Sequence, residues 1–166
     1  MIAQRFTIVA LFLFSIACTS AQASGISVRF TESGLYKLDN IKEIEDASTA
    51  LGRRHTANAT LSQNTDRVPL TIGTSFGITF VVTSASNAPN VKLRKIMRFP
   101  SPGLKNLQTG KTKSYDEAMM TYVPGQEQKA WYTLEEPFEL VPGVWKFELW
   151  DGNQKIGERA FTLSKP

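Results

Sequence analysis

Large hydrophobic residues alternate with polar or small residues along several short stretches of the chain. Phe76, Ile78, Phe80 and Val82 share one parity, and most residues between them are small or polar. A period of two is typical of a β-strand that turns one face toward a core. The same parity rule holds for Ile26/Val28/Phe30, Val68/Leu70/Ile72, Val91/Leu93/Met97/Phe99, Trp145/Phe147/Leu149 and, more weakly, Ala130/Tyr132/Leu134. The pattern predicts a protein built from short strands.

Turn-forming residues separate these stretches. They lie at Asn87–Asn90, Pro100–Gly103, Pro124-Gly125, Pro142-Gly143 and Asp151-Gly152. Strands at this spacing predict an all-β fold, an antiparallel sandwich of about seven strands. The only stretch with helical character, residues 41–50, is too short and polar to organise a core.

The clearest element is a hairpin at the C-terminal end. Its first strand covers Trp145–Trp150, and after a turn the chain returns through Ile156–Leu163. Ile156 and Phe161 differ in parity, so an unbroken return strand cannot place both in the core. A bulge at Gly157 would correct this.

The first 23 residues have the features of a signal peptide. Arg5 supplies a positive charge, residues 6–17 form an uncharged apolar run, and Ala21-Gln22-Ala23 matches the small-x-small pattern before a cleavage site. The apolar run is too short for a permanent membrane span. We expect a mature single domain over residues 24–166 in the periplasm or outside the cell. The alternative is a lipoprotein anchored through Cys18.

Loss of this signal would leave no cysteine, because Cys18 is the only one in the chain. The mature protein could then form no disulfide and would have no thiol nucleophile. A zinc site needs three or four ligands, and the chain holds one histidine, His55. We expect neither a metal site nor another cofactor.

One pentapeptide, Gly73-Thr74-Ser75-Phe76-Gly77, fits the G-x-S-x-G pattern of a hydrolase nucleophile elbow. An elbow requires a helix after the serine and a histidine later in the chain. Here a strand pattern follows, and His55 precedes Ser75. We interpret the segment as a tight turn that enters a core strand.

Adjacent carboxylates occur at Asp116-Glu117 and Glu135-Glu136. Neighbours in an extended chain point to opposite faces, so neither pair makes a two-carboxylate site by itself. A glycosidase-like site would need acids from distant segments. We assign no catalytic residue and keep a hydrolase with dispersed carboxylates as a minor alternative.

Residues 39–66 are rich in asparagine, threonine, serine and charged residues. They are expected to form a long polar connection inside the domain, which is either a solvated loop or a functional one. His55 follows Arg53 and Arg54 in this segment, and we expect it to be solvated.

Cations are concentrated between Lys92 and Lys113, a segment with seven of them and no acid. The formal charge of +4 falls to +3 without Arg5, so the rest of the mature chain is net negative. In the predicted strand Lys92, Arg94 and Arg98 share the outward parity and form a basic row. This row is expected to meet an acidic envelope protein, a glycan or lipid head groups, or to be a solvated face that prevents edge pairing. Nucleic acid is not expected, because the chain is exported and shows no nucleic-acid-binding motif.

Trp150 has the parity of Lys146 and Glu148, so in a regular strand it would face outward. An outward tryptophan beside a turn can stack on a sugar ring or anchor a partner. It can also fold over the end of the sandwich and close the core.

Three strings occur in order along the chain: Gly73-x-x-Phe76-Gly77, Phe99-Pro100-x-Pro102-Gly103-Leu104 and Glu139-Leu140-Val141-Pro142-Gly143-x-Trp145. Together they resemble a family of small exported bacterial proteins catalogued only as a domain of unknown function, over residues 34–163. The resemblance implies an immunoglobulin-like sandwich and a cell-envelope location. It brings no established activity and no catalytic residues. The motif residues also have a structural explanation: Pro142-Gly143 is expected to form the turn that places Trp145 in the core.

These observations predict a non-enzymatic binding or accessory module of the bacterial cell envelope, with no transmembrane segment after signal removal. The candidate partner contacts are Lys92, Arg94, Arg98 and Trp150. The alternative is a carbohydrate-binding module that uses Trp150 and nearby tyrosines.

Overall fold

The computed structural model describes residues 25–46, 49–86, 88–106 and 110–166. The expected signal peptide, including Cys18, lies outside these residues. The described chain forms eleven strands and the short 3₁₀ helix η1 (Pro137–Glu139). The strands are β1 (Ile26–Glu45), β2 (Arg53–Asn64), β3 (Arg67–Pro69), β4 (Ser75–Ser84), β5 (Val91–Arg98), β6 (Leu104–Lys105), β7 (Thr112–Lys113), β8 (Tyr115–Tyr122), β9 (Glu127–Thr133), β10 (Gly143–Asp151) and β11 (Gln154–Ser164). Over the described ranges no helix has the length and hydropathy to cross a membrane.

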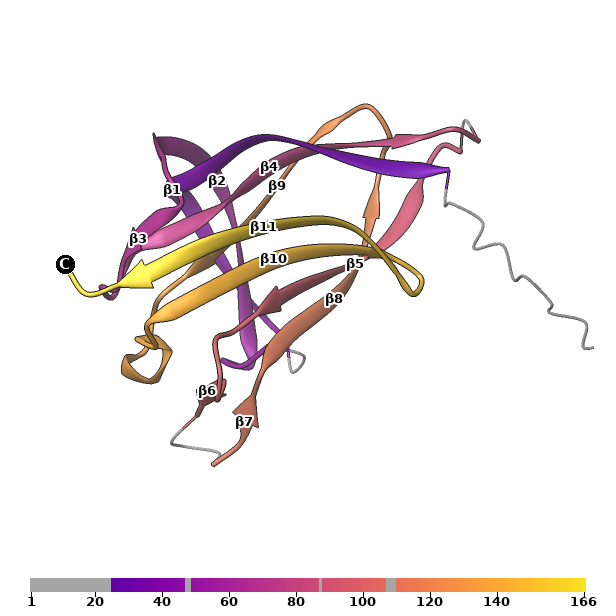
Figure 1. Ribbon diagram of the computed structural model, residues 1–166. Coiled ribbons are helices and arrows are strands. Elements are labelled where there is room, and N and C mark those ends of the chain that lie inside the picture. Colours follow the sequence, from indigo (N-terminus) through magenta and orange to yellow (C-terminus); the bar gives the residue numbers. More distant parts are fainter. Residues whose placement is uncertain (1–24, 47–48, 87, 107–109) are drawn as a thin grey trace, which may run out of the picture.

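Two large sheets form the layers of a sandwich (Figure 1). One has the strand order β2-β1-β4-β9 and the other the order β3-β11-β10-β5-β8. Neighbouring strands are antiparallel except for the short β3, which runs parallel to β11. The antiparallel sandwich is confirmed. There are more strands than the sequence pattern predicted, because polar segments also form strands.

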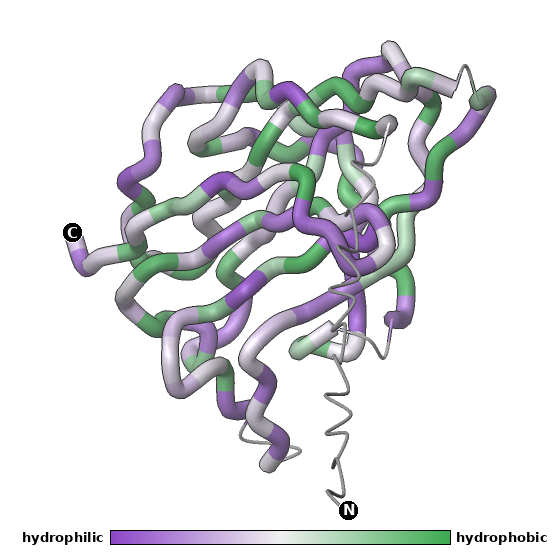
Figure 2. Tube along the Cα trace, turned by 45° about the vertical axis from the view of Figure 1, so that its right-hand side comes forward, coloured by the Kyte–Doolittle hydropathy of each residue, from purple (hydrophilic) through white to green (hydrophobic). Residues whose placement is uncertain are grey.

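The hydrophobic core lies between the two sheets. Phe76 on β4 is fully buried, and its ring makes edge contacts with Trp145, Phe147 and Phe161 of the opposite sheet at centroid distances of 5.2–6.1 Å. Hydrophobic and hydrophilic residues alternate along these strands (Figure 2). Each large buried side chain contributes roughly 1.5–3 kcal/mol of transfer free energy. The predicted period-two faces therefore supply the core.

The C-terminal hairpin is confirmed, with β10 paired to β11 over its whole length. Leu149 pairs with Gly157 and Trp150 with Lys155, so Ile156 is the extra residue of a bulge beside the predicted glycine. The turn before β10 requires a glycine, because Gly143 has φ of +133° and a Cβ there would lie 2.9 Å from Pro100. The strand then begins with its tryptophan in the core.

The expectation of an unstructured polar connection at residues 39–66 is wrong. The second half of β1 pairs with β2 from Gly34/Asn64 to Glu45/Arg53, which makes a long hairpin. No helix forms in the described part of residues 41–50. The hairpin was missed because most of its side chains are exposed, so backbone pairing holds it together without a hydrophobic period.

The predicted core strand at Val68/Leu70/Ile72 is shorter than expected. Val68 and Leu70 are buried, but β3 ends at Pro69 and Ile72 is 47% exposed. Proline cannot donate a ladder hydrogen bond, and the chain turns directly after it, with Thr74 N–H donating to the Thr71 carbonyl.

β1 pairs with β4 only as far as Leu35. Beyond this point the β1–β2 hairpin passes over the outer face of β4 and β9. The hydroxyl groups of Tyr36 and Thr79 are 2.6 Å apart, and Lys129 Nζ of β9 donates to the Ala59 carbonyl of β2 at 2.8 Å. Thr79 alternates with core residues of β4, so its side chain is on the side away from the other sheet. The hairpin therefore extends past the edge strand β9.

Candidate functional site

A cavity of about 240 Å³ lies where the edge strands β8 and β9 of the two sheets approach each other. Met97, Met120 and Phe147 give it apolar walls, and the β1–β2 hairpin contributes Leu51 and several charged residues. Pockets that hold small molecules combine an apolar lining with a few polar groups in this way. This cavity is the candidate site.

Hydrogen bonds hold the end of the β1–β2 hairpin over the cavity. Lys113 Nζ donates to the Thr49 carbonyl at 2.8 Å, and Asn106 Nδ2 donates to the Ala50 carbonyl at 3.3 Å. The Ala50 backbone also hydrogen-bonds the Asp116 carboxylate of β8. These contacts join the hairpin to the β6–β8 region, on the far side of the opening from β9.

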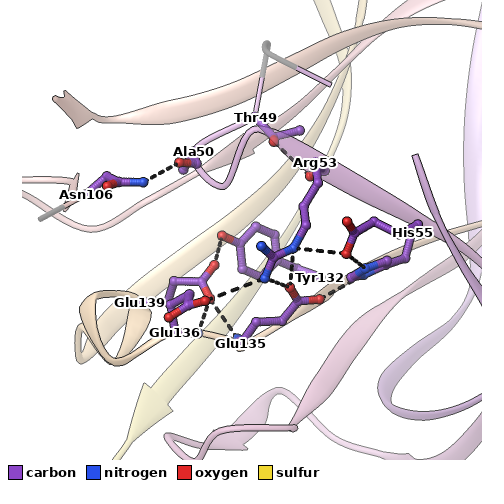
Figure 3. A network of polar contacts seen from close by, with 10 residues as sticks. Thr49, Ala50, Arg53, His55, Asn106, Tyr132, Glu135, Glu136 and Glu139 are labelled. Atoms are coloured by element: carbon purple, nitrogen blue, oxygen red, sulfur yellow. Dashed lines mark hydrogen bonds and ion pairs between the residues drawn. The ribbon is translucent and has the colours of Figure 1, made fainter. Parts of the chain in front are cut away.

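Arg53 fixes the same hairpin to the chain after β9 (Figure 3). Its Nη2 lies 2.9 Å from Glu135 Oε2 and 3.5 Å from Glu136 Oε1, and its Nε lies 3.4 Å from Glu43 Oε2. The hydrogen bonding of Arg53 to the Glu135 carboxylate, which accepts from the guanidinium, is the largest cause of the raised pKa of Arg53, which therefore stays charged. His55 Nδ1 is 2.7 Å from Glu135 Oε1.

Two expectations are wrong at this network. His55 is not solvated among cations, since its side chain is 18% exposed, contacts Glu43 and Glu135 and lines the cavity. Glu135 and Glu136 do not point to opposite faces, because both reach Arg53. The alternation rule fails for them because the chain has left β9 and bends into η1 at this point.

A fully buried carboxylate, Glu139, holds this bend in place. It accepts hydrogen bonds from the backbone N–H groups of Glu135 and Glu136 at 2.7 and 2.8 Å and from the Tyr132 hydroxyl. Burial raises the pKa of Glu139, and it raises the pKa of Tyr132 as well. Because all its contacts are inside the protein, we assign Glu139 a structural role.

Two charged residues that line the cavity have fewer partners than Glu139. Lys95 of β5 lies between the buried Leu93 and Met97 on the inward parity, and no hydrogen bond or ion pair of Lys95 is formed within the described chain. Asp116 Oδ1 of β8 is buried without a hydrogen bond, and Lys113 Nζ lies 3.6 Å from it. Burial lowers the pKa of Lys95 and raises that of Asp116, in each case against the charged form.

Lys95 could have been found in the sequence. It has the parity of Val91, Leu93, Met97 and Phe99, and a cation on the buried face of a predicted strand is a signal for a special site. Asp116 had no such signal, because the residue types along β8 show little hydrophobic alternation, although burial alternates strictly in the folded strand.

The predicted basic row does lie on the outer face of the sheet, away from the cavity. Lys92 is exposed, Arg94 Nη1 lies 3.9 Å from Glu117, and Arg98 forms two hydrogen bonds with Glu148 on β10 at 2.9 and 3.0 Å. Two of the three cations thus have acidic neighbours on adjacent strands, which reduces the positive potential of the row.

Trp150 faces outward on this same sheet, as its parity predicts. Its Nε1 donates to Glu148 Oε2 at 2.9 Å, and the cationic groups of Arg94 and Lys155 lie over its ring at 5.4 and 5.9 Å from the centroid. Cation–π contacts of this kind occupy ring surface that a sugar would use. The row and Trp150 are therefore brought together into one polar cluster.

Glu148 is nearly fully buried, and the hydrogen bonds from Arg98 are the largest cause of its lowered pKa. A carboxyl group with a lowered folded-state pKa stabilises the fold above its unfolded-state pKa, about 4.3, and this contribution disappears as pH falls through the folded-state pKa.

We expect Glu148→Gln to be about 1–3 kcal/mol less stable at pH 7 and to lose less stability than the wild type between pH 6 and pH 3. Urea denaturation at each pH measures this. Glu117→Gln, at an exposed carboxylate, serves as control and should keep the wild-type pH profile; an unchanged profile for Glu148→Gln would contradict the assignment.

The G-x-S-x-G segment has the structure expected of a turn into a strand. Ser75 begins β4, and its hydroxyl lies 2.8 Å from that of Thr133 on β9. No helix follows it, so the elbow geometry is not formed. In the described part of the chain, no three His, Cys, Asp or Glu side chains are grouped as a metal site would require.

A family profile described as "Domain of unknown function (DUF3859)" matches residues 25–163. An immunoglobulin-like protein from Pseudomonas aeruginosa, of known crystal structure, is similar to this chain with a TM-score of 0.59 and 21% identity, over 87% of this chain and 100% of that one. This likeness confirms the immunoglobulin-like fold. An alkylpurine DNA glycosylase from Pseudomonas fluorescens bound to DNA gives a TM-score of 0.42 and 11% identity over 84% of this chain and 30% of that one, too low to carry an argument. None of the curated proteins matches this sequence.

Proposed function

Because the chain belongs to the DUF3859 family, a domain of unknown function, we propose from its geometry that it is a non-enzymatic binding module that takes a small organic molecule into the cavity between β8 and β9. We also propose that it does so in the cell envelope, as its N-terminal sequence suggests. The single observation that carries the proposal is a lined cavity that holds a lysine, Lys95, without an acceptor and a buried carboxylate oxygen, Asp116 Oδ1, without a hydrogen bond.

The size and lining of the cavity support a compact ligand. Its volume of about 240 Å³ is slightly below the range of roughly 300–1,000 Å³ that is common for small-molecule sites. Polymer recognition normally uses an open groove or an exposed aromatic platform. Here the hairpin carrying Arg53 covers the site, and the outward Trp150 has cations over its ring.

The carboxylates beside the cavity support a binding function rather than bond cleavage. Glu139 has a full set of internal hydrogen bonds, and Glu135 is occupied by Arg53 and His55. A general acid or base must be free to exchange a proton with a bound substrate. We therefore propose no reaction step for these carboxylates.

A cavity-filling substitution tests this proposal. Ala118 of β8 lines the cavity, whereas the next residue, Met119, is 65% exposed on the opposite face. Wild type, Ala118→Phe and Met119→Phe are screened by thermal shift against a panel of amino acids, hydroxy acids, short fatty acids and sugars. A ligand at 100 times its Kd should raise the Tm of the wild type and of Met119→Phe by roughly 5–10 °C and leave that of Ala118→Phe unchanged.

Two results would overturn the proposal. One is a panel without any compound that stabilises the wild type, or with hits that bind Ala118→Phe equally well. The other is chemical change of a bound compound, detected by mass spectrometry after incubation with purified protein, because this would indicate an enzyme.

A further inference from the structure

The chemistry of the cavity also indicates which class of molecule fits it, and this inference rests on the proposed function. Lys95 and Asp116 lie on neighbouring antiparallel strands, where Lys95 is opposite Ala118 and Asp116 is opposite Met97. The two charged residues are therefore diagonal neighbours on one face of the sheet, a relation in which side chains start about 7–8 Å apart. No ion pair joins them within the described chain.

The other charged groups around the cavity have partners. Arg54 Nε lies 3.3 Å from Asp46, and Lys129 donates to the Ala59 carbonyl. Arg53 is held by carboxylates, as described above. Lys95 is the cation of the lining for which the described chain supplies no acceptor. Asp116 has the Ala50 backbone as a hydrogen-bond partner and Lys113 Nζ at 3.6 Å, but its buried Oδ1 receives no hydrogen bond.

A buried charge or a buried acceptor atom without a hydrogen bond costs free energy, and a ligand that gives Lys95 an acceptor and Asp116 Oδ1 a donor lowers that cost. An anionic group would accept hydrogen bonds from Lys95, and a nearby cationic N–H group would donate to Asp116. The apolar walls formed by Met97, Met120 and Phe147 would then surround a hydrocarbon side chain.

We propose that the cavity binds a free apolar α-amino acid, with its carboxylate on Lys95, its ammonium group on Asp116 and its side chain against the two methionines and the phenylalanine. The two charges of an amino acid are separated by a single carbon atom, which suits two opposite charges on adjacent strands. The site as a whole stays neutral when the ligand is bound. A phosphate or a long-chain acid would satisfy Lys95 alone and leave Asp116 Oδ1 without a hydrogen bond.

Three related probes separate the contributions of the two groups. Leucine carries both charges, 4-methylpentanoate lacks the amine, and 3-methylbutylamine lacks the carboxylate. We expect wild-type protein to bind leucine more tightly than either analogue by roughly 10- to 100-fold in isothermal titration calorimetry, because each charged hydrogen bond contributes to affinity. D-leucine and L-leucine are both titrated, since the cavity has a handed lining.

Two substitutions assign the partners. Lys95→Met keeps the length of the side chain and should weaken leucine and 4-methylpentanoate roughly 10- to 100-fold while leaving 3-methylbutylamine unchanged. Asp116→Asn should weaken leucine and 3-methylbutylamine and leave 4-methylpentanoate unchanged. Lys95→Met removes a partly buried cation without a partner, so its Tm should equal or exceed that of the wild type, which controls for folding.

The outcomes distinguish this inference from the proposed function. Wild-type affinity for leucine in Lys95→Met, or equal wild-type affinity for leucine and for its two analogues, would overturn the amino-acid assignment. So would a thermal-shift panel in which only another class of compound binds and Ala118→Phe abolishes that binding, although the binding cavity itself would then stand. Leucine binding that survives in Ala118→Phe would overturn both.

Discussion

Replacing Trp145 by alanine is expected to lower the free energy of unfolding by about 3–5 kcal/mol. The indole is completely buried, and its ring contacts those of Phe99 and Tyr132 at centroid distances of 4.9 and 5.3 Å. Its Nε1 donates to the Val141 carbonyl at 3.0 Å, so the substitution also removes a partner from a carbonyl at the turn before β10. Urea denaturation followed by far-ultraviolet circular dichroism measures the change.

The adjacent position supplies the control for this prediction. Val144 is 47% exposed and points away from the core, so Val144→Ala should change the stability by no more than about 0.5 kcal/mol. A loss below about 1 kcal/mol for Trp145→Ala would show that the aromatic cluster is not the centre of the core.

The second large effect is expected for Gly77→Ala, which should cost about 3 kcal/mol. Gly77 lies near the start of β4, paired with Gly34 on one side and Trp131 on the other. An added Cβ would lie 2.3 Å from the Ala130 carbonyl oxygen and 2.8 Å from Trp131 Cα, and both are backbone atoms. Relief would require β9 to move away, which would break the β4–β9 ladder and displace one wall of the cavity.

Gly157→Ala is the matched control, since it also adds a methyl group in a strand. Its Cβ would meet Phe30 Cζ at 3.1 Å, and this is the end of a side chain that can shift. We expect a smaller loss than for Gly77→Ala, together with retained ligand binding. Equal thermal stabilities of the two variants would mean that the close approach of β9 at Gly77 is not maintained in solution.

The residues that sequence analysis placed well are those whose position follows from local pattern. Phe76, Phe80 and Trp145 lie in the core, and the bulge beside Gly157 restores Phe161 to the core. Each depends on strand alternation or on the conformational preference of a turn residue, and both are properties of a few consecutive residues. Ile72 is the exception, because a turn after Pro69 interrupts the alternation.

The candidate site could not be predicted in the same way. His55 and Glu135 are separated by most of the domain in sequence, and they meet only because the β1–β2 hairpin lies across the edge of the sandwich. That hairpin has little hydrophobic pattern, since much of it is exposed, and polar composition alone does not distinguish it from a loop. The outward basic row was visible in the sequence, but the acidic neighbours of Arg94 and Arg98 come from other strands.

The sequence by itself therefore determined the β architecture, the main turns and the identity of the core, because alternation and turn chemistry act between near neighbours. Only the tertiary structure decided that Lys95 and Asp116 face one covered cavity and that the acids after β9 hold Arg53. The physical reason is that these contacts depend on how strands from distant parts of the chain pack side by side. Such packing is fixed by the burial of the whole core and not by any segment alone.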